Sequence, residues 1–174
     1  MFDDFCNTIK IICLENINSE ELFSKIKCHL MKYKPLELNE IIEEKIDLDY
    51  DKIKKSIIQN NNRDAYYKYF LYNSDLFDIV HIKWLKNCES KIHDHPESGC
   101  IMFIINDGKL NETIYYNNHN GNIIKTCTNT LNCGDITFIK ANKKLHKIKA
   151  KMYTESIHIY IPGNYKTNYY SINK

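Results

Sequence analysis

The sequence predicts a mainly β protein, a small barrel or sandwich of short strands preceded by a layer of helices. The hydrophobic period changes near residue 65, from helical spacing before it to short alternating runs after it. Those runs are rich in Ile, Tyr, Phe and Thr, and turn motifs such as "NDG" and "NCG" separate them. The chain has 174 residues, about one domain, so we expect a single domain with a helical part over 1–62 and a β-barrel over 63–174.

Helices are expected in the first part of the chain. In "INSEELFSKIKCHLMKYKP", Asn18 followed by Glu21 resembles a capping box, and the apolar residues recur at helical spacing until Pro35 marks the end. "LNEIIEEKI" and "YDKIKKSIIQ", residues 38–46 and 50–59, indicate two shorter helices, and "QNNNRD" indicates the loop that leaves them. We expect these helices to pack on one side of a sheet.

Eight short runs in the second part of the chain are expected to form strands. They are "YYKYFLY", "FDIVHIKW", "CIMFIIN", "KLNETIYY", "NIIKTCT", "DITFIK", "LHKIKA" and "ESIHIYI". No internal repeat or linker divides them, so they predict one β unit.

Composition excludes several classes of function. The net charge is +2, from 24 basic and 22 acidic residues scattered along the chain, so there is no basic stripe for nucleic acid. No apolar run approaches the roughly 20 residues that span a membrane. The seven cysteines form no CxxC pair, and the first residues lack the features of a secretion signal, so free thiols are expected. We expect a cytoplasmic monomer whose partner is a small molecule, with no nucleic acid and no membrane.

Two histidines in "KIHDHPESGC", His93 and His95, are the first candidates for a metal site. On an extended strand both side chains project to one face, where two imidazoles can hold one ion. The pair alone is weak evidence, because such pairs also occur at solvated strand ends. "LHKI" supplies His146 on a later strand that a barrel can bring beside the first. Three histidines with open positions indicate a reactive site, and they suit iron, zinc, nickel or copper.

The other histidines give a weaker signal. His29, His81 and His119 have no partner at ligand spacing, so we expect them to be ordinary surface or core histidines. His158 lies in the strand "SIHIY", between Ser156 and Tyr160.

Together these motifs resemble a known family. "HDHPESGC", preceded by "FDIVHIKW" and followed by "LNET", "LHKI" and "SIHIYIP", is similar to thiol dioxygenases of the cysteine dioxygenase type over about residues 60–165. The resemblance implies a cupin fold, a double-stranded β-helix or jelly-roll barrel, with the helices as an N-terminal layer. It also implies that Cys100 stands where other cupins have a glutamate ligand. In the family this cysteine is joined by a thioether to a tyrosine, here Tyr160, so Cys100 is expected to be a crosslink partner and not a ligand.

The resemblance implies ferrous iron, Fe(II), held by His93, His95 and His146. Three neutral imidazoles leave the ion its charge and one open face, where a substrate thiolate and O₂ can meet. In this interpretation Tyr160 donates a hydrogen bond or a proton, and His158 and Ser156 form a relay along the same strand face. The alternative is a structural strand with a packed tyrosine and a satisfied histidine.

The substrate-binding residues are where the chain departs from the family pattern. The family holds the substrate carboxylate with an arginine two residues after a tyrosine, and the matching stretch "YYKYFLY" has Tyr66 and Lys68. Lysine is a point charge without the planar fork of arginine, so looser orientation and lower affinity are expected. Lys68 can also be an ordinary solvated lysine. Trp84 and Ile82 alternate along the next strand and are expected to wall the pocket, or to be plain core.

The sequence therefore predicts a cysteine dioxygenase-like oxidoreductase that oxidises L-cysteine with O₂ to cysteine sulfinic acid. An alternative is a dioxygenase for another thiol, such as 3-mercaptopropionate, cysteamine or the N-terminal cysteine of a peptide. A second alternative is a cupin that binds a metal and catalyses nothing.

Overall fold

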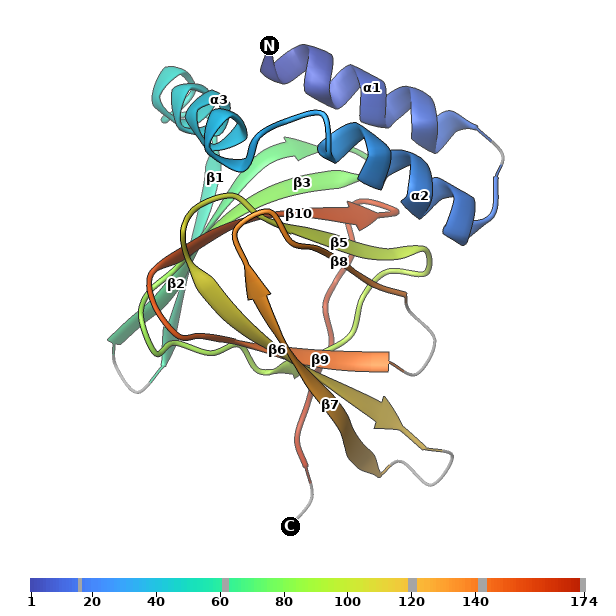
Figure 1. The fold of residues 1–174 in the computed structure, drawn as a ribbon, viewed down its shortest axis with the longest axis vertical. Helices are drawn as coiled ribbons and strands as arrows, with labels where there is room; N and C mark the ends of the chain where they lie inside the picture. Colours follow the sequence, from blue (N-terminus) through green and yellow to red (C-terminus); the bar gives the residue numbers. More distant parts are fainter. Residues whose placement is uncertain (16, 61–62, 119–121, 141–143, 173–174) are drawn as a thin grey trace.

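The computed structural model describes residues 1–15, 17–60, 63–118, 122–140 and 144–172. Its helices come first and its strands follow, as Figure 1 shows. The helices are α1 (Phe2–Leu14), α2 (Ser19–Leu30) and α3 (Pro35–Leu48). The strands are β1 (Lys54–Asn60), β2 (Arg63–Asn73), β3 (Asp78–Trp84), β4 (Ile92–His93), β5 (Gly99–Ile104), β6 (Lys109–Asn117), β7 (Ile123–Asn132), β8 (Ile136–Ile139), β9 (Lys144–Ala150), β10 (Thr154–Ile161) and β11 (Tyr169–Tyr170).

The strands form two antiparallel sheets that face each other as the two walls of a barrel. One sheet has the order β1-β2-β3-β10-β5-β8 and the other β11-β4-β9-β6-β7. Neighbouring strands such as β3 and β10 are far apart in sequence, which is the crossed connectivity of a double-stranded β-helix. The predicted fold class, a mainly β cupin barrel with an N-terminal helical layer, is confirmed.

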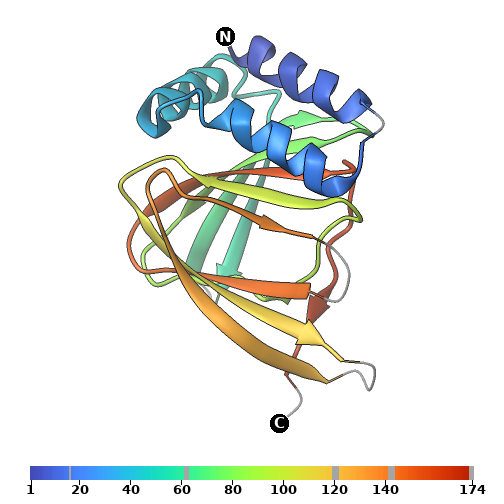
Figure 2. The same ribbon diagram turned by 45° about the vertical axis from the view of Figure 1, so that its right-hand side comes forward.

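The helical layer covers the outer face of the six-stranded sheet (Figure 2). Side chains alternate between the two faces of a strand, so β10 contributes Ile157 and Ile159 to the core beneath the helices and turns His158 and Tyr160 toward the barrel interior. Central strands of this sheet are therefore buried on both faces, which explains the unbroken apolar run in β5. The barrel interior is left for a second core cluster and for the polar site described below.

The structure confirms some of the predicted helix boundaries and corrects others. The side chain of Asn18 accepts hydrogen bonds from the backbone N–H groups of Glu20 and Glu21, at 3.0 and 3.1 Å, so Asn18 caps α2 as predicted. Helix α2 ends at Leu30, before the predicted end at Pro35, and Pro35 begins α3 in its first turn, where a missing N–H costs nothing. Helix α1 was not predicted, although its buried residues, among them Phe5 and Ile9, recur at helical spacing.

All eight predicted strands are confirmed, but the helix predicted over 50–59 is wrong. Residues 54–60 form β1, which pairs antiparallel with β2. "KIKKSII" fits both periods, and its adjacent β-branched Ile57 and Ile58 favour a strand once β2 offers a partner. The β part therefore begins at Lys54, before the predicted boundary at residue 63.

Core packing beneath the helices predicts a stability effect. Ile26 in α2 is 0% exposed, whereas Ile11 in α1 is 63% exposed. Ile26→Ala should lower the free energy of unfolding by about 2–5 kcal/mol, because it removes buried methyl groups and leaves a cavity. Ile11→Ala should change it by less than about 0.5 kcal/mol. Denaturant unfolding of both variants measures this, and equal losses would contradict the assigned packing.

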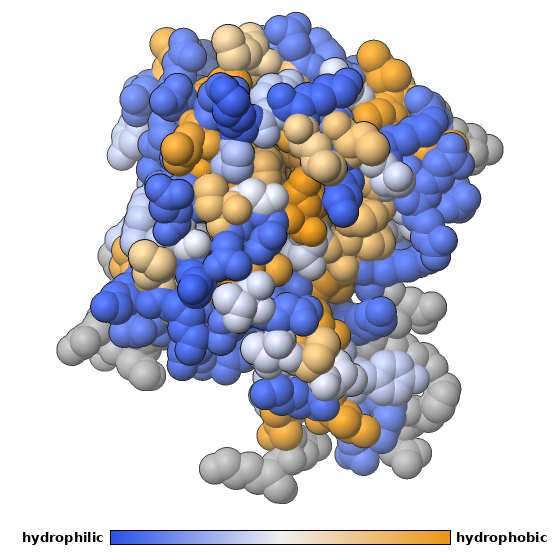
Figure 3. Space-filling view, viewed as in Figure 1, coloured by the Kyte–Doolittle hydropathy of each residue, from blue (hydrophilic) through white to orange (hydrophobic). Residues whose placement is uncertain are grey.

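The face of the molecule drawn in the space-filling view of Figure 3 is mostly hydrophilic, with apolar side chains scattered among the polar ones. Among the described residues, no helix is long and apolar enough to cross a membrane.

Candidate metal centre

Three histidines from separate parts of the chain meet inside the barrel. The pairing of β4 with β9 sets His93 directly opposite His146, and His95 follows just after β4. Their ring centroids lie 4.4–5.1 Å apart. One nitrogen from each ring lies within 4.8 Å of the others, and the Nε2 atoms of His93 and His146 are 3.2 Å apart. The structure thus brings together all three histidines predicted from the sequence.

The chemistry of these rings fits a cation. Both ring nitrogens of His95 are buried without a hydrogen-bond partner, which is costly unless something binds them. Burial lowers the pKa of His93 to about 4 and lowers the pKa values of His95 and His146 well below their ordinary value. The imidazoles are therefore neutral at pH 7 and offer lone pairs, the form that a metal requires.

His93 and His146 are each oriented by a hydrogen-bond partner at Nδ1, the ring nitrogen that faces away from the centre of the cluster. His93 Nδ1 lies 2.8 Å from the carbonyl oxygen of Lys91, and His146 Nδ1 lies 2.8 Å from Glu112 Oε1. When Nδ1 carries the proton and donates to these oxygens, Nε2 of each ring presents its lone pair to the centre.

Glu112 was not predicted as a site residue. It is buried in β6, and its second oxygen accepts a hydrogen bond from Thr137 Oγ1 at 3.0 Å. Since its carboxylate contacts the outer nitrogen of His146, it positions that ring and is not one of the three converging groups. The sequence signal was a charged residue at an inward position of "LNET". Its place beside His146 follows only from the pairing of β6 with β9.

Glu112→Gln should weaken metal binding by about 10- to 100-fold, because the amide is a poorer acceptor for the His146 N–H. The matched control is Glu20→Gln, an exposed position on α2. Metal titration of both variants measures the effect. Unchanged affinity in Glu112→Gln would show that the carboxylate does not orient His146.

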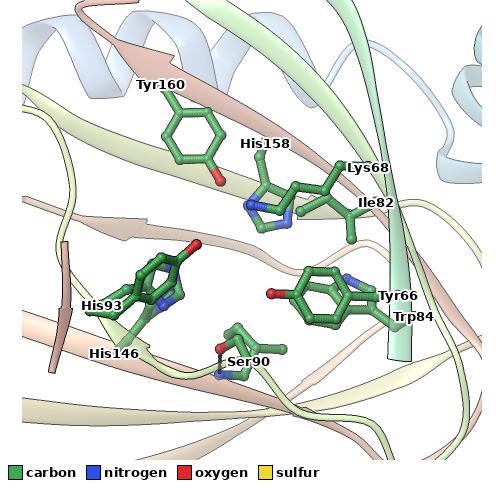
Figure 4. A pocket seen from close by; sticks show the side chains of 11 residues that line it. Tyr66, Lys68, Ile82, Trp84, Ser90, His93, His146, His158 and Tyr160 are labelled. Atoms are coloured by element: carbon green, nitrogen blue, oxygen red, sulfur yellow. Dashed lines mark hydrogen bonds between the residues drawn. The ribbon is translucent and has the colours of Figure 1, made fainter. Parts of the chain in front are cut away.

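A pocket opens beside the histidines, and Figure 4 shows the side chains that line it. Its volume is about 300 Å³, part of it open to solvent. The lining residues are Tyr66, Lys68, Ile82, Trp84, Ser90, His93, His146, Ile148, His158, Tyr160 and Tyr169. All four residues predicted to bind substrate are in this set. Ser90, Ile148 and Tyr169 were not predicted, and Tyr169 reaches the site only because β11 pairs with β4.

Lys68 is the cationic side chain of this pocket. Figure 4 shows Lys68 among the side chains that line the pocket, and its ammonium nitrogen lies 5.9 Å from the centre of the Tyr66 ring. Its shielding from water lowers the pKa of Lys68 below its ordinary value. Within the described part of the chain no carboxylate forms an ion pair with Lys68, so its charge is available to a ligand.

A hydrogen-bonded chain runs behind the pocket. Trp84 Nε1 donates to Ser156 Oγ at 2.9 Å, and Ser156 Oγ lies 3.0 Å from His158 Nε2. Ser156 can then donate to Nε2, which leaves the proton of His158 on Nδ1, 3.9 Å from the sulfur of Cys100. Burial lowers the pKa of His158 well below its ordinary value, so this ring is neutral.

Cys100 and Tyr160 lie directly opposite each other on β5 and β10. Side chains in such a pair share a face and approach closely. Burial, assisted by the charge of Glu112, raises the pKa of the Cys100 thiol, and burial raises that of the Tyr160 hydroxyl. Both groups are therefore protonated at pH 7, and Cys100 is not part of the three-histidine cluster.

The histidines expected to be ordinary have different surroundings. His29 is buried in α2, stacked on Phe5 and edge-on to Tyr33. His81 is buried in β3. His119 lies outside the described residues.

Comparisons with known proteins give one family and one fold. A family model described as cysteine dioxygenase type I matches residues 58–173. The chain is 29% identical over 91 residues to cysteine dioxygenase type 1 of Rattus norvegicus, and equally to that of Mus musculus; the match covers 49% of this chain and 45% of each relative. The aligned part thus spans about half the length of these curated relatives. Oxalate decarboxylase from Bacillus subtilis superposes with a TM-score of 0.52 at 12% identity, over 69% of this chain and 30% of that chain, a likeness of fold alone.

Proposed function

The chain belongs to the cysteine dioxygenase type I family, and from that premise we propose that it is a one-domain Fe(II)-dependent thiol dioxygenase that oxidises L-cysteine with O₂ to cysteine sulfinic acid. The observation that carries the proposal is the three-histidine cluster opening into a pocket that also holds Lys68, which forms no ion pair with a carboxylate of the described residues. In the reaction the thiol gains both atoms of O₂ on sulfur, and no other reductant is needed.

In this proposal His93, His95 and His146 hold the iron. When bound, the ion lowers the pKa of a substrate thiol and gives thiolate and O₂ a common place to react. Three imidazoles equally suit zinc, nickel or copper, so the choice of Fe(II) rests on the family.

Lys68 binds the substrate carboxylate in this account. Its ammonium lies inside the pocket, and a carboxylate there would receive a charge-assisted hydrogen bond. Tyr66, Trp84 and Ile82 form the wall beside it, so they shape the pocket and exclude water. The Tyr66 ring packs against Trp84 with centroids 4.5 Å apart, which fixes both side chains.

Tyr160 is proposed to hold the proton nearest the reacting sulfur. Figure 4 shows its hydroxyl pointing into the pocket between the histidines and Lys68. His158 is held by Ser156 through Nε2 and lies next to Tyr160 on the same face of the strand. The centroids of the His158 and Tyr160 rings are 6.0 Å apart. This arrangement supports a relay in which Tyr160 donates a hydrogen bond to the substrate. His158 and Ser156, in hydrogen-bond contact with each other, form the rest of the relay.

The proposed thioether between Cys100 and Tyr160 predicts a mass change. Joining the sulfur to the tyrosine ring removes one S–H and one C–H hydrogen, with O₂ as the oxidant, so the intact mass falls by two hydrogens. After turnover with iron, cysteine and O₂, wild-type protein should contain this lighter species. Cys100→Ser should not form it, whereas Cys88→Ser, a change at another buried free thiol, should. Peptide mapping that recovers only separate Cys100 and Tyr160 peptides would contradict the crosslink.

A different thiol is the second candidate substrate, because Lys68 lacks the planar fork that fixes a carboxylate at two points. Oxygen uptake with cysteine, 3-mercaptopropionate, cysteamine and a peptide with an N-terminal cysteine distinguishes the candidates. We expect the highest kcat/KM with cysteine. Higher values with cysteamine or the peptide would reassign the substrate, and no uptake with any thiol would leave a metal-binding cupin without this activity.

We also propose that the protein acts as a cytoplasmic monomer on a small thiol and O₂. None of the seven cysteines forms a disulfide in the described structure, which supports a reducing compartment.

A further inference from the structure

A second polar cluster lies on the opposite face of the strands that build the pocket. Ile82 and Trp84 of β3 face the barrel interior, so His81 and Lys83 face the helical layer. On β10 the same alternation turns Glu155 outward, beside Lys83, while Ser156 faces inward. Glu43 of α3 reaches this outer face through its contacts with Lys83 and His81.

The cluster has the geometry of a cation site. His81 Nε2 lies 2.9 Å from Glu155 Oε2, and His81 Nδ1 lies 3.8 Å from Glu43 Oε1. One donor atom from each of Glu43, His81 and Glu155 lies within 4.8 Å of the others. No residue of this cluster belongs to the three-histidine centre.

Several donor atoms of the cluster lack hydrogen bonds. His81 is 0% exposed, and both of its ring nitrogens are buried without a hydrogen-bond partner, as is Glu155 Oε2, whereas Glu43 Oε1 is paired with Lys83 Nζ at 2.8 Å. His81 Nε2 and Glu155 Oε2 are close but not aligned as a hydrogen bond. The same feature marks His95 at the metal centre. Leaving buried polar groups unsatisfied is costly. A bound ion would accept the lone pair of one ring nitrogen of His81 and contact one oxygen of each carboxylate, and the other ring nitrogen would carry the proton.

The charges of the cluster also favour a cation. Lys83 Nζ contacts the two carboxylate oxygens of Glu43 at 2.8 and 2.9 Å and so balances one negative charge. Burial alone would raise the pKa of Glu155, but contacts with His81 and Tyr153 and the charge of Lys83 outweigh burial, and the net effect is a lowered pKa. The Glu155 carboxylate is therefore ionised at pH 7. Tyr153 donates to Glu155 Oε1 at 2.8 Å, and Oε2 remains directed at His81.

We propose that Glu43, His81 and Glu155 form a second binding site for a divalent transition-metal cation, which ties α3 to β3 and β10. One imidazole and two carboxylates are a donor set that suits Zn²⁺. Lys83 is the competitor of the ion for Glu43. Its side chain is 22% exposed and can turn outward when the ion binds. The site goes beyond the proposed dioxygenase activity and does not depend on it.

Zinc titration of the full chain by calorimetry, with metal analysis after dialysis, tests this site. Wild-type protein should bind two equivalents of Zn²⁺, one at each site. His81→Gln and Glu155→Gln should each lose one equivalent, or bind it at least about 100-fold more weakly, since losing an outer partner of a ligand alone costs 10- to 100-fold. His146→Ala should lose the other equivalent. Lys83→Met should bind the second equivalent several-fold more tightly, because the competing cation is gone.

Two further variants keep the test decisive. Glu43→Gln changes a side chain that is 37% exposed on α3, so it should fold even if the buried variants do not, and it should weaken the second equivalent. Glu20→Gln, at an exposed position of α2, should bind two equivalents. A wild-type protein that binds one equivalent, lost in His146→Ala, would overturn the proposal. A second equivalent that persists unchanged in Glu43→Gln, His81→Gln and Glu155→Gln would also overturn it.

Discussion

Replacing His146 with Ala should remove both the bound iron and the oxygen uptake of the protein. His146 is held from both sides, by Glu112 at Nδ1 and by the approach of His93 at Nε2. With this ring gone, only two imidazoles remain, and most of the chelate advantage is lost. Since losing an outer partner of a ligand alone costs 10- to 100-fold, we expect less than about 1% of wild-type activity.

The matched control for this variant is His29→Gln, which changes a buried histidine in α2 that is outside the metal centre. It should retain iron and activity. Metal analysis, thermal unfolding and oxygen uptake are measured on both variants. Tightly held, stoichiometric iron in a folded His146→Ala protein would show that the three-histidine assignment is wrong.

Lys68→Ala should lower kcat/KM for cysteine by about 10- to 100-fold. The proposed pair between its ammonium and the substrate carboxylate is a charge-assisted hydrogen bond of roughly 1.5–3 kcal/mol, and each 1.4 kcal/mol is a factor of ten. Iron content should not change, because Lys68 is not one of the proposed iron ligands. Oxidation of cysteamine, which has no carboxylate, should be little affected.

Two variants sharpen the Lys68 experiment. Lys68→Arg should keep or improve activity with cysteine, because it restores the planar fork. Lys86→Ala, at an exposed position after β3, should leave both substrates unaffected. Steady-state oxygen uptake with each thiol gives the comparison. Equal losses for cysteine and cysteamine in Lys68→Ala would show that Lys68 supports the structure and does not bind the carboxylate.

Local sequence patterns predicted most of the elements, and the exceptions have a physical cause. The Asn18 cap and the eight strands depend on nearby residues, and the structure confirms them. Residues 54–60 became a strand because β2 pairs with them, and that partner cannot be seen from the local period. Helix α1 carries a local signal of its own, because Phe5 and Ile9 recur at helical spacing.

Site residues that lie in a sequence motif could be predicted, whereas those brought to the site only by strand pairing could not. His93 and His95 form a local motif, "LHKI" on a later strand offered His146, and the family resemblance added Lys68 and Tyr160. Glu112 and Tyr169 became visible only after β6 paired with β9 and β11 with β4, because the register sets which side chains reach His146 and His93. The cluster around His81 needed the docking of α3 onto β3, which no sequence pattern indicated.

The most direct test of the proposed activity is the mass of the thiol product formed by protein of measured iron content under isotopically labelled O₂. With one iron per chain and cysteine as the thiol, we expect a sulfinic acid that carries two labelled oxygen atoms, formed in proportion to the O₂ consumed. The product should be absent when His146→Ala replaces the wild type. Unchanged cysteine, a disulfide as the only product, or a sulfinate whose oxygen comes from water would contradict the proposed dioxygenase.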